Sequence, residues 1–159
     1  MTSPTGDVVV CDASPLIVLA RVEQVELLKQ LFVNVYAPPA VWSEATGDAS
    51  APGADVLLGA SWIRVRAPGV VPQSRLGLGE REAMGLAAEL SAVLIVDDGA
   101  ARAEAVALGV RITGTLGILR RAKREGLVAA VAPTILRMRA IGLRVSDALV
   151  EAVLKDVGE

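Results

Sequence analysis

The chain has 159 residues, of which 53% are hydrophobic and 21% charged, and its net charge is −2. This composition is typical of a globular protein, and we expect a single domain over residues 1–159, large enough to bury roughly 68–70% of its unfolded surface. The sequence has no histidine and one cysteine, which excludes imidazole metal sites, multi-thiolate metal sites and Ser-His catalysis. Aromatic residues make up only 3%, so base stacking is not expected to dominate any binding of nucleic acid.

No apolar run approaches ~20 residues, the length of a membrane-spanning helix, so no association with a membrane is expected. The first residues lack a basic segment followed by an apolar one, which argues against a secretory signal and for a cytoplasmic location. Cys11 has no second cysteine to pair with and lies in an apolar run, which predicts a core residue.

Strand and helix signals alternate along the first half of the chain. Residues 8–11 are a mostly β-branched apolar run, typical of a buried parallel strand that ends at Asp12. Ser14 and Pro15 predict the start of a helix, with Ser14 as the N-cap and Pro15 at the first helical position. The next predicted elements are helical residues 16–20 and 25–32 (one bent helix or two), a strand at 33–37, a helix from 39 or 40 to about 47, a loop or short helix at 47–59 and an edge strand at 62–66.

The second half continues the alternation after a connection at 68–78 that contains proline and glycine. The predicted elements are a helix at 79–90, a strand at 93–96, a helix at 100–108, a strand at 110–113, a helix at 115–124 and two further helices at 133–141 and 146–157. This order predicts an α/β fold, a three-layer α/β/α sandwich with a mostly parallel central sheet.

Acidic residues stand at four positions where a predicted strand ends or a predicted helix begins. They are Asp12, Glu44, the pair Glu80 and Glu82, and the tandem Asp97-Asp98. The carboxyl ends of parallel strands meet at one edge of a sheet, and this edge is where ligands bind in open α/β folds. Carboxylates with water are the ligands that suit Mg²⁺ and Mn²⁺, and like charges held close together raise each other's pKa unless a cation neutralises them. The pattern therefore predicts a divalent-metal site.

Structural roles compete with the metal role at the two strand ends. Asp12 fits a helix cap, but Ser14 already fits that position, which favours the metal role for Asp12. The tandem Asp97-Asp98 precedes a glycine and fits an ordinary strand-end turn. Because successive side chains of an extended segment alternate faces, the sequence leaves open which of the two aspartates points to the site.

The two helical acidic positions are also ambiguous. Glu80 and Glu82 both fit the first turn of their helix, where the helix dipole favours negative charge, and residues two apart do not share a helix face. One of the two is therefore expected at the site, and Glu80 is preferred because it directly follows Gly79 at the head of the helix. Glu44 alone means little, and its weight comes from the other acidic positions.

Positive charge is concentrated in the last third of the chain. Residues 101–145 contain nine Arg or Lys and two Glu, so this stretch has a net charge of about +7 and the remainder about −9. Four of these basic residues lie within one predicted helix: Arg120, Arg121, Lys123 and Arg124. Such a run fits a track for an RNA phosphate backbone, and it fits a plain solvated helix face equally well.

Common nucleotide and phosphate motifs are absent from the sequence. There is no G-x-x-x-x-G-K-[ST] loop, and Gly77-Leu-Gly79 lacks the third glycine of a dinucleotide fingerprint. The segment after the first strand lacks the second aspartate of the D-x-D phosphatase motif. A phosphoryl-accepting receiver domain needs its acidic pair near the first strand, whereas here the pair comes late.

The order and spacing of the acidic segments resemble the PIN domain family, specifically its VapC-like prokaryotic branch. The matching segments, which span nearly the whole chain from Val8, are DASPLIVLARVEQVELLKQLF, PPAVWSEA, LGLGEREAMGLAAEL, LIVDDGAARAEAVALGV and GTLGILRRAKREGL. The last two resemble a subgroup with DDxxAR and GTLG signatures. One departure concerns the third acidic position, where many relatives have aspartate and this chain has Glu80 or Glu82.

The resemblance implies a metal-dependent endoribonuclease, commonly the toxin of a toxin–antitoxin pair, that forms a homodimer and is silenced by a small antitoxin protein. It implies a catalytic set of Asp12, Glu44, Glu80 and Asp98, with Glu82, Asp97, Ser14 and Thr115 as second candidates. Mg²⁺ or Mn²⁺ would be held by Asp12, Asp98, Glu80 and Asp97, and the basic run would bind the RNA substrate. The alternative is a non-catalytic PIN-like module that binds RNA or protein for regulation.

Overall fold

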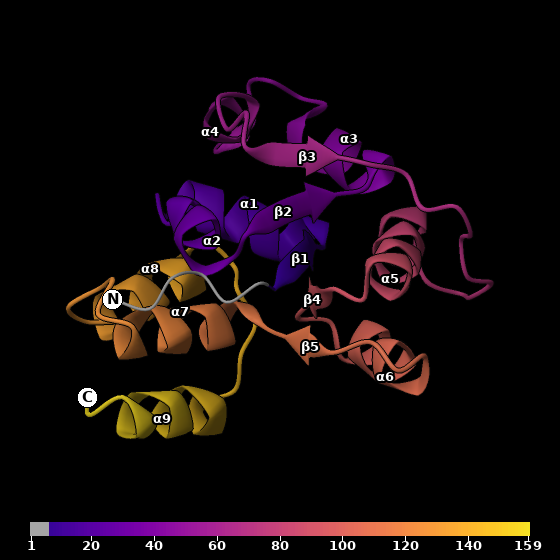
Figure 1. Cartoon of the computed structure of the whole chain (residues 1–159). Coiled ribbons are helices and arrows are strands. Elements are labelled where there is room, and N and C mark those ends of the chain that lie inside the picture. The colour runs from indigo at the N-terminus through magenta and orange to yellow at the C-terminus, as the bar shows by residue number, and fades with distance from the viewer. Residues whose placement is uncertain (1–6) are drawn as a thin grey trace.

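Five parallel strands form one sheet in the computed structural model, which describes residues 7–159 (Figure 1). In chain order they are β1 (Val8–Cys11), β2 (Asn34–Ala37), β3 (Ile63–Val65), β4 (Val93–Ile95) and β5 (Ile112–Thr113). Their spatial order is β3-β2-β1-β4-β5, and every neighbouring pair is parallel. The first six residues, on which the expectation about a secretory signal partly rests, lie outside the described range.

The central strand β1 fixes the position of the candidate site. Val9 and Val10 have no solvent exposure, which suits β-branched side chains in a sheet covered on both faces. From β1 the chain builds outward to β2 and β3 on one side, then returns to place β4 and β5 on the other. The ends of β1 and β4 are therefore neighbours at the point where the strand order reverses, which is the usual ligand position in open α/β sheets.

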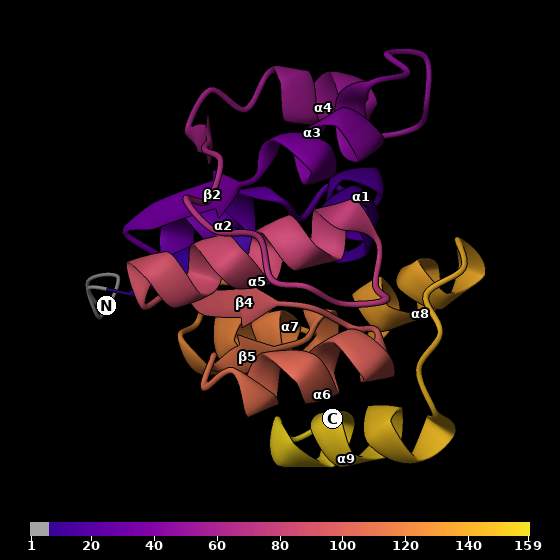
Figure 2. The same ribbon diagram turned by 90° about the vertical axis from the view of Figure 1, so that its right-hand side faces the viewer.

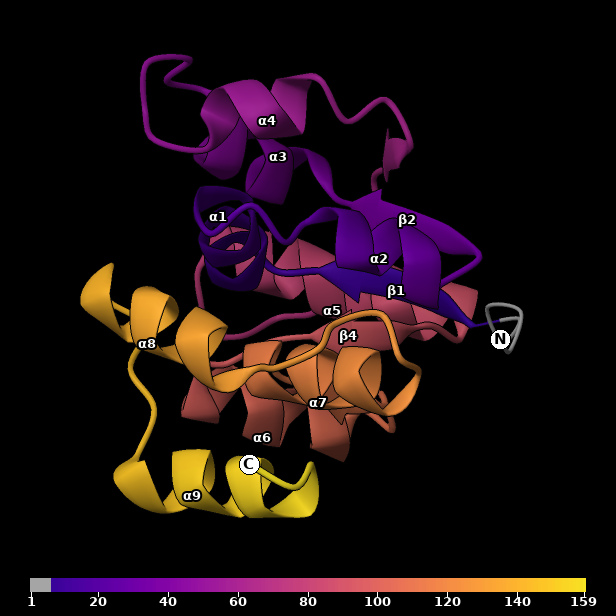
Figure 3. The same cartoon turned by 90° about the vertical axis from the view of Figure 1, so that its left-hand side faces the viewer.

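Helices cover both faces of the sheet. Those of the described residues are α1 (Ala13–Arg21), α2 (Glu26–Leu31), α3 (Pro39–Thr46), α4 (Ala54–Leu58), α5 (Leu78–Leu90), α6 (Gly99–Ala107), α7 (Thr115–Arg124), α8 (Ala132–Ala140) and α9 (Asp147–Asp156). Helices α5 and α6 lie on one face (Figure 2), and α1, α2 and α7 lie on the other (Figure 3). The predicted three-layer α/β/α sandwich is confirmed.

Helix α3 joins the two helical layers. It contacts α1 on one face of the sheet and α5 on the opposite face. It follows β2 directly, so it crosses the edge formed by the carboxyl ends of the strands. Glu44 of α3 is thereby brought toward residues of α5, from which it is separated by more than thirty positions in the sequence.

Several details of the predicted elements are settled by the structure. The region after β1 contains two helices, because Glu23 between them has a φ of 60° in the left-handed region, which a continuous helix does not allow. The predicted edge strand is β3, at one end of the strand order. Cys11 is a core residue with 1% exposure, and burial raises the pKa of its thiol to about 12. Within residues 7–159, no helix is long and apolar enough to cross a bilayer.

The predicted start of α1 is wrong. Ser14 was expected to be the N-cap, but the N-cap is Asp12 and the helix begins at Ala13. The Asp12 N–H donates a hydrogen bond to the carbonyl of Ile95 in the neighbouring strand β4 at 3.0 Å. This bond keeps the Asp12 backbone extended, so the helix begins at the next residue, Ala13. Ser14 is consequently the second helical residue, and Pro15 the third.

Candidate active site

Asp12 is a buried carboxylate at the end of the central strand. Its side chain is almost fully enclosed, and its Oδ1 accepts a hydrogen bond from the Ala13 N–H at 2.9 Å. Burial raises its pKa to about 6, and the charges of Glu80, Glu44 and Asp97 raise it further against the opposing effect of the Ala13 hydrogen bond. The capping role and the proximity to other carboxylates therefore coexist in one residue.

Glu44 and Glu80 lie near each other where α3 contacts α5. A Cβ placed on Gly79 would lie 3.5 Å from the Glu44 Oε2, so the end of Glu44 rests beside the backbone that leads to Glu80. Glu80 is partly buried, and its pKa is raised by burial and then by the charges of Asp98 and Glu44. Glu80 thus lies within electrostatic reach of four other acidic residues: Asp98, Glu44, Glu104 and Asp12.

Glu82 has a different, structural place. It is buried, with 9% exposure, and its Oε1 accepts a hydrogen bond from the Ala40 N–H at 3.0 Å. The first turn of α3 has no cap of its own, since its N-cap position is Pro38 without a side-chain hydrogen bond. Glu82 therefore caps α3 from a neighbouring helix. Glu82 is the fifth residue of α5, so the prediction that it belongs to the first turn of this helix is wrong.

Asp97 is held rigidly by the residues that follow β5. Its Oδ1 accepts from the Thr115 N–H at 2.8 Å, and its Oδ2 accepts from the Thr115 hydroxyl at 2.5 Å. The approach is close because Gly114 has no side chain: a Cβ there would lie 2.8 Å from the Asp97 Oδ1. Thr115, which has no solvent exposure, fixes the orientation of this carboxylate.

Asp98 lies on the rim of the acidic cluster. It is exposed, and its Oδ2 accepts from the Ala101 N–H at 3.0 Å as the N-cap of α6. Its charge acts on Glu80, whereas the charge of Asp97 acts on Asp12. Both tandem aspartates therefore belong to the acidic cluster, Asp97 near Asp12 and Asp98 near Glu80. The assignment of Asp98 as the catalytic aspartate stays a prediction.

The carboxylates lie at one edge of the sheet, but they are not arranged as a complete metal-binding site. Among residues 7–159, no group of three or more Asp, Glu or Cys side chains is arranged to hold one ion. Asp12 and Asp97 are fixed by hydrogen bonds, whereas Glu44 is exposed and Glu80 partly exposed. An ion shared by all four would therefore require some of these side chains to move from their present positions. The donor chemistry itself, carboxylates with water, fits Mg²⁺ or Mn²⁺.

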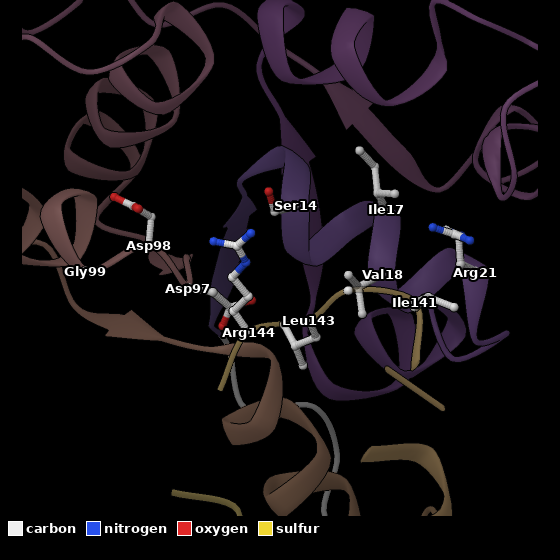
Figure 4. Close-up of a pocket in the computed structure, with 11 residues that line it drawn as sticks. Ser14, Ile17, Val18, Arg21, Asp97, Asp98, Gly99, Ile141, Leu143 and Arg144 are labelled. Atoms are coloured by element: carbon white, nitrogen blue, oxygen red, sulfur yellow. The ribbon is translucent and has the colours of Figure 1, made fainter. Parts of the chain in front are cut away.

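Two clefts flank Asp97 and share Arg144. The first, of about 510 Å³, lies between α1, the turn after β4 and the connection from α8 to α9. Figure 4 shows Arg144 extending toward Ser14 and the tandem aspartates, with Arg21 at the far end of the cleft beyond Ile17 and Val18. The second, of about 440 Å³, lies between β5, α7 and α9.

Arg144 and Arg21 were not singled out by the sequence analysis. Arg144 was counted only as part of a basic stretch, and Arg21 was not considered. Neither forms an ion pair among the described residues, although both line the first cleft. No local sequence signal places the connection from α8 to α9 at the sheet edge, because that placement depends on tertiary packing.

The basic run of α7 has partners inside the protein. Arg121 donates to the Leu31 carbonyl at 2.9 Å and stacks over the Phe32 ring, with 4.9 Å to the ring centroid. Its neighbours bind the C-terminal segment instead: Lys123 pairs with Glu159, and Arg120 and Arg124 pair with Asp156. These contacts give the run a structural role, and its role in RNA binding stays a prediction.

The direction of α7 separates the basic residues from one another. The helix starts at Thr115, next to the acidic cluster, and rises about 1.5 Å per residue, so Arg124 lies about 13 Å away along the axis. Arg120 lines the second cleft. Arg120 is therefore the member of the run that shares a cleft with Asp97, and Arg124 is directed toward the opposite end of the sheet.

Glu159→Gln is expected to lower the melting temperature at neutral pH and to have little effect in acid. Hydrogen bonds from the Val131 and Ala132 N–H groups, with the Lys123 ammonium, hold the pKa of Glu159 below its usual value. A carboxylate with a lowered folded-state pKa contributes stability above its unfolded-state pKa and loses it as the pH falls. Thermal melts of this variant and of Glu151→Gln, an exposed residue of α9, check the effect; equal melting temperatures for the two at pH 7 would contradict it.

Comparison with known proteins places the chain in a family. A family model described as "DUF3368: PIN domain" matches residues 8–159. The chain belongs to the PIN domain family. PIN domains are generally nucleases that use divalent metal ions, and the predicted family resemblance is thereby confirmed at this level.

The PIN-like fold is also found in a solved structure from an archaeon. It is a PilT N-terminus domain protein from the hyperthermophilic archaeon Sulfolobus solfataricus, with a TM-score of 0.56 and 21% sequence identity over 72% of this chain and 92% of that one. At this identity the likeness concerns the fold alone. A search of curated proteins found no match.

Proposed function

We propose that this PIN domain is a divalent-metal-dependent endoribonuclease that hydrolyses RNA phosphodiester bonds with Mg²⁺ or Mn²⁺. The observation that supports it best is the setting of Asp12, a buried carboxylate whose pKa is raised to about 6 and on which the charges of Glu80, Glu44 and Asp97 act. Like charges gathered at a sheet edge destabilise one another, and a bound divalent cation removes that cost. A purely structural aspartate needs no such surroundings.

Each carboxylate of the acidic cluster has a role in this proposal. Asp12 and Asp97 are the fixed ligands, and Glu44 and Glu80 complete the set after a change of rotamer, with Asp98 as the alternative ligand beside Glu80. The metal supplies a bound water of lowered pKa and a counter-charge for the phosphate. Thr115 holds Asp97 in orientation, and Ser14, exposed at the first cleft, is positioned to hydrogen-bond an RNA phosphate or a water.

The two signatures of the proposed VapC-like subgroup meet at Asp97. In the DDxxAR segment, Arg102 donates from its Nη1 to the Val96 carbonyl at 2.8 Å and so ties α6 to the end of β4. In the GTLG segment, Gly114 leaves room for the carboxylate and Thr115 binds it. Both segments thus serve one ligand position, which supports placing the chain in that subgroup. The toxin role, the homodimer and a small antitoxin partner belong to the same proposal.

A non-catalytic PIN-like module remains a second candidate function. It is favoured by the finding that no three carboxylates of residues 7–159 are positioned to share an ion. The two functions differ in a simple property, because the nuclease must bind Mn²⁺ or Mg²⁺ and the regulatory module need not.

The matched pair Glu80→Gln and Glu82→Gln tests the proposal. With Mn²⁺ or Mg²⁺, the wild-type protein is expected to cleave a mixed pool of structured and single-stranded RNA, and EDTA is expected to stop it. Glu80→Gln should lower the rate at least about 100-fold, because it removes a ligand charge. Glu82→Gln should retain cleavage, since its amide oxygen can still accept the Ala40 hydrogen bond.

Three results would contradict parts of the proposal. Cleavage that persists in EDTA would remove the metal from the mechanism. An equal loss of cleavage rate in Glu80→Gln and Glu82→Gln would remove the distinction between Glu80 as a metal ligand and Glu82 as the cap of α3. Absence of both cleavage and Mn²⁺ binding, measured by calorimetry, would favour the regulatory module.

A further inference from the structure

The second cleft has an unusual balance of charge. Three arginines line it, Arg102, Arg120 and Arg144, and its one acidic lining residue is Asp97. Both carboxylate oxygens of Asp97 already accept hydrogen bonds from Thr115. The cleft therefore presents cationic groups to any occupant, directly beside an acidic cluster that would hold metal.

The guanidinium groups of this cleft retain donors for a ligand. A guanidinium has five N–H donors. For Arg102 the structure gives one bond, from Nη1 to the Val96 carbonyl. Arg120 has a loose contact, 3.7 Å from its Nε to the Asp156 Oδ2, which Arg124 approaches more closely. Arg144 has no ion pair or side-chain hydrogen bond among the described residues.

The position of Arg144 is built by its neighbours. Arg139 donates from Nη2 to the Val145 carbonyl at 2.7 Å and to the Asp147 Oδ1 at 2.8 Å, so it clasps the chain on the C-terminal side of Arg144. On the other side the Leu143 N–H donates to the Met138 carbonyl at 3.0 Å. The connection is thus ordered by hydrogen bonds that leave the Arg144 side chain free to line both clefts, of which Figure 4 shows the first.

We infer that the cleft lined by Arg102, Arg120 and Arg144 binds the RNA phosphate adjacent to the scissile one. The inference rests on the proposed ribonuclease function and adds a subsite to it. Guanidinium groups match phosphate with paired hydrogen bonds, and a polyanion crossing Asp97 from the acidic edge enters this cleft. The remaining lining consists of aliphatic residues, glycines, Thr113 and Ser146, without aromatic rings, so the cleft recognises the backbone rather than the bases.

This subsite also explains how charges of opposite sign can serve one substrate. The acidic cluster repels RNA until a divalent cation neutralises it, whereas the arginine cleft attracts RNA without any metal. Binding of the neighbouring phosphate would therefore bring the scissile phosphate to the acidic edge. The C-terminal segment, through Arg144, becomes part of the substrate site.

A binding experiment tests the subsite without relying on catalysis. The probe is a fluorescein-labelled single-stranded RNA of about 12 nucleotides and mixed sequence, titrated in EDTA with Asp12→Asn protein between about 50 and 250 mM KCl. Adding Arg144→Gln is expected to raise Kd about ten-fold and to make the salt dependence shallower by about one unit of slope. The control is Arg137→Gln on α8, an exposed arginine outside both clefts, which should change Kd less than about two-fold.

Cleavage of modified RNA supplies the second measurement. After the cleaved bond of a defined RNA is mapped, a neutral methylphosphonate replaces the phosphate on either side of it. One of the two replacements is expected to slow wild-type cleavage about ten-fold and to add no further loss in Arg144→Gln, because both changes remove the same contact. If the modified RNA and Arg144→Gln together lower the cleavage rate by the product of their separate effects, the subsite is overturned.

The outcomes separate the subsite from the nuclease. Cleavage by the wild type together with unchanged affinity and salt slope in Arg144→Gln would overturn the subsite and leave the nuclease standing. Affinity that depends on Arg144 in a wild-type protein that cleaves no RNA would support an RNA phosphate site in this cleft and would overturn both the nuclease and the position of that phosphate beside a scissile bond. Equal competition by poly-glutamate and by RNA for the Arg144-dependent site would overturn the assignment to RNA in favour of an acidic protein segment.

Discussion

Asp12→Asn is expected to abolish RNA cleavage and, at the same time, to make the metal-free protein more stable at neutral pH. The Asp12 carboxylate is 6% exposed, and its pKa is raised from 3.8 to about 6, first by burial and then by the neighbouring carboxylates. A rise of this size corresponds to a cost of about 3 kcal/mol for the charged form in the folded protein. Asparagine removes the charge and keeps an oxygen that can accept the Ala13 hydrogen bond.

The sign of the pH dependence follows from the raised pKa. Between pH 3.8 and about 6 the folded protein binds more protons at Asp12 than the unfolded chain does, so this residue lowers stability as the pH rises. The increase in the free energy of unfolding in Asp12→Asn should therefore be fully present above about pH 6 and nearly absent near pH 4. Urea unfolding in EDTA at pH 4.5 and pH 7.5 measures it.

Bound metal is expected to reverse the order of stability of the wild-type protein and Asp12→Asn. Mn²⁺ should stabilise the wild-type protein, because binding to the folded state alone raises the free energy of unfolding, and it should leave Asp12→Asn unchanged. A less stable Asp12→Asn protein at pH 7.5 in EDTA would show that the acidic cluster imposes no electrostatic cost. An equal Mn²⁺ response in both proteins would remove Asp12 from the metal site.

Much of the fold follows from local signals in the sequence. The β-branched run before Asp12 and the regular alternation of strand and helix patterns predict a parallel sheet with helices on both faces, and the structure has this architecture. The order of the strands is not encoded locally. That β1 and β4 are neighbours, although helices α1 to α5 separate them in the sequence, is decided by packing in the whole sheet.

The choices within each acidic pair also depend on tertiary contacts. Asp12 and Ser14 are both good N-caps, and the hydrogen bond from Asp12 to Ile95 in the neighbouring strand decides between them. Glu80 and Glu82 are distinguished by α3, whose uncapped first turn takes the Glu82 carboxylate. The same argument applies to Arg144, which reaches the acidic edge only because α9 packs against α7 and the connection from α8 leads there.

The last large effect expected is at Asp97, through the two residues that shape its position. Thr115→Val removes the hydroxyl that donates to Asp97 at 2.5 Å and leaves a partly buried carboxylate oxygen without that donor, at a cost of about 1.5–3 kcal/mol. Metal affinity and cleavage should fall about 10-fold to 100-fold, as for other groups that orient a ligand. Thr115→Ser retains the hydroxyl and should retain most of both.

Glycine substitutions test the same position through space rather than through hydrogen bonding. The Cβ of Gly114→Ala would lie 2.8 Å from the Asp97 Oδ1 and 3.2 Å from the Arg102 Nη1, so the carboxylate must move away from Thr115. Gly99→Ala is the matched control, because its Cβ would meet nothing within 4 Å although it lies two residues from Asp97. Mn²⁺ titration and cleavage assays should therefore show a loss in Gly114→Ala and none in Gly99→Ala. If both variants behave like the wild type, Asp97 is not a ligand, and Asp98 becomes the aspartate that completes the site.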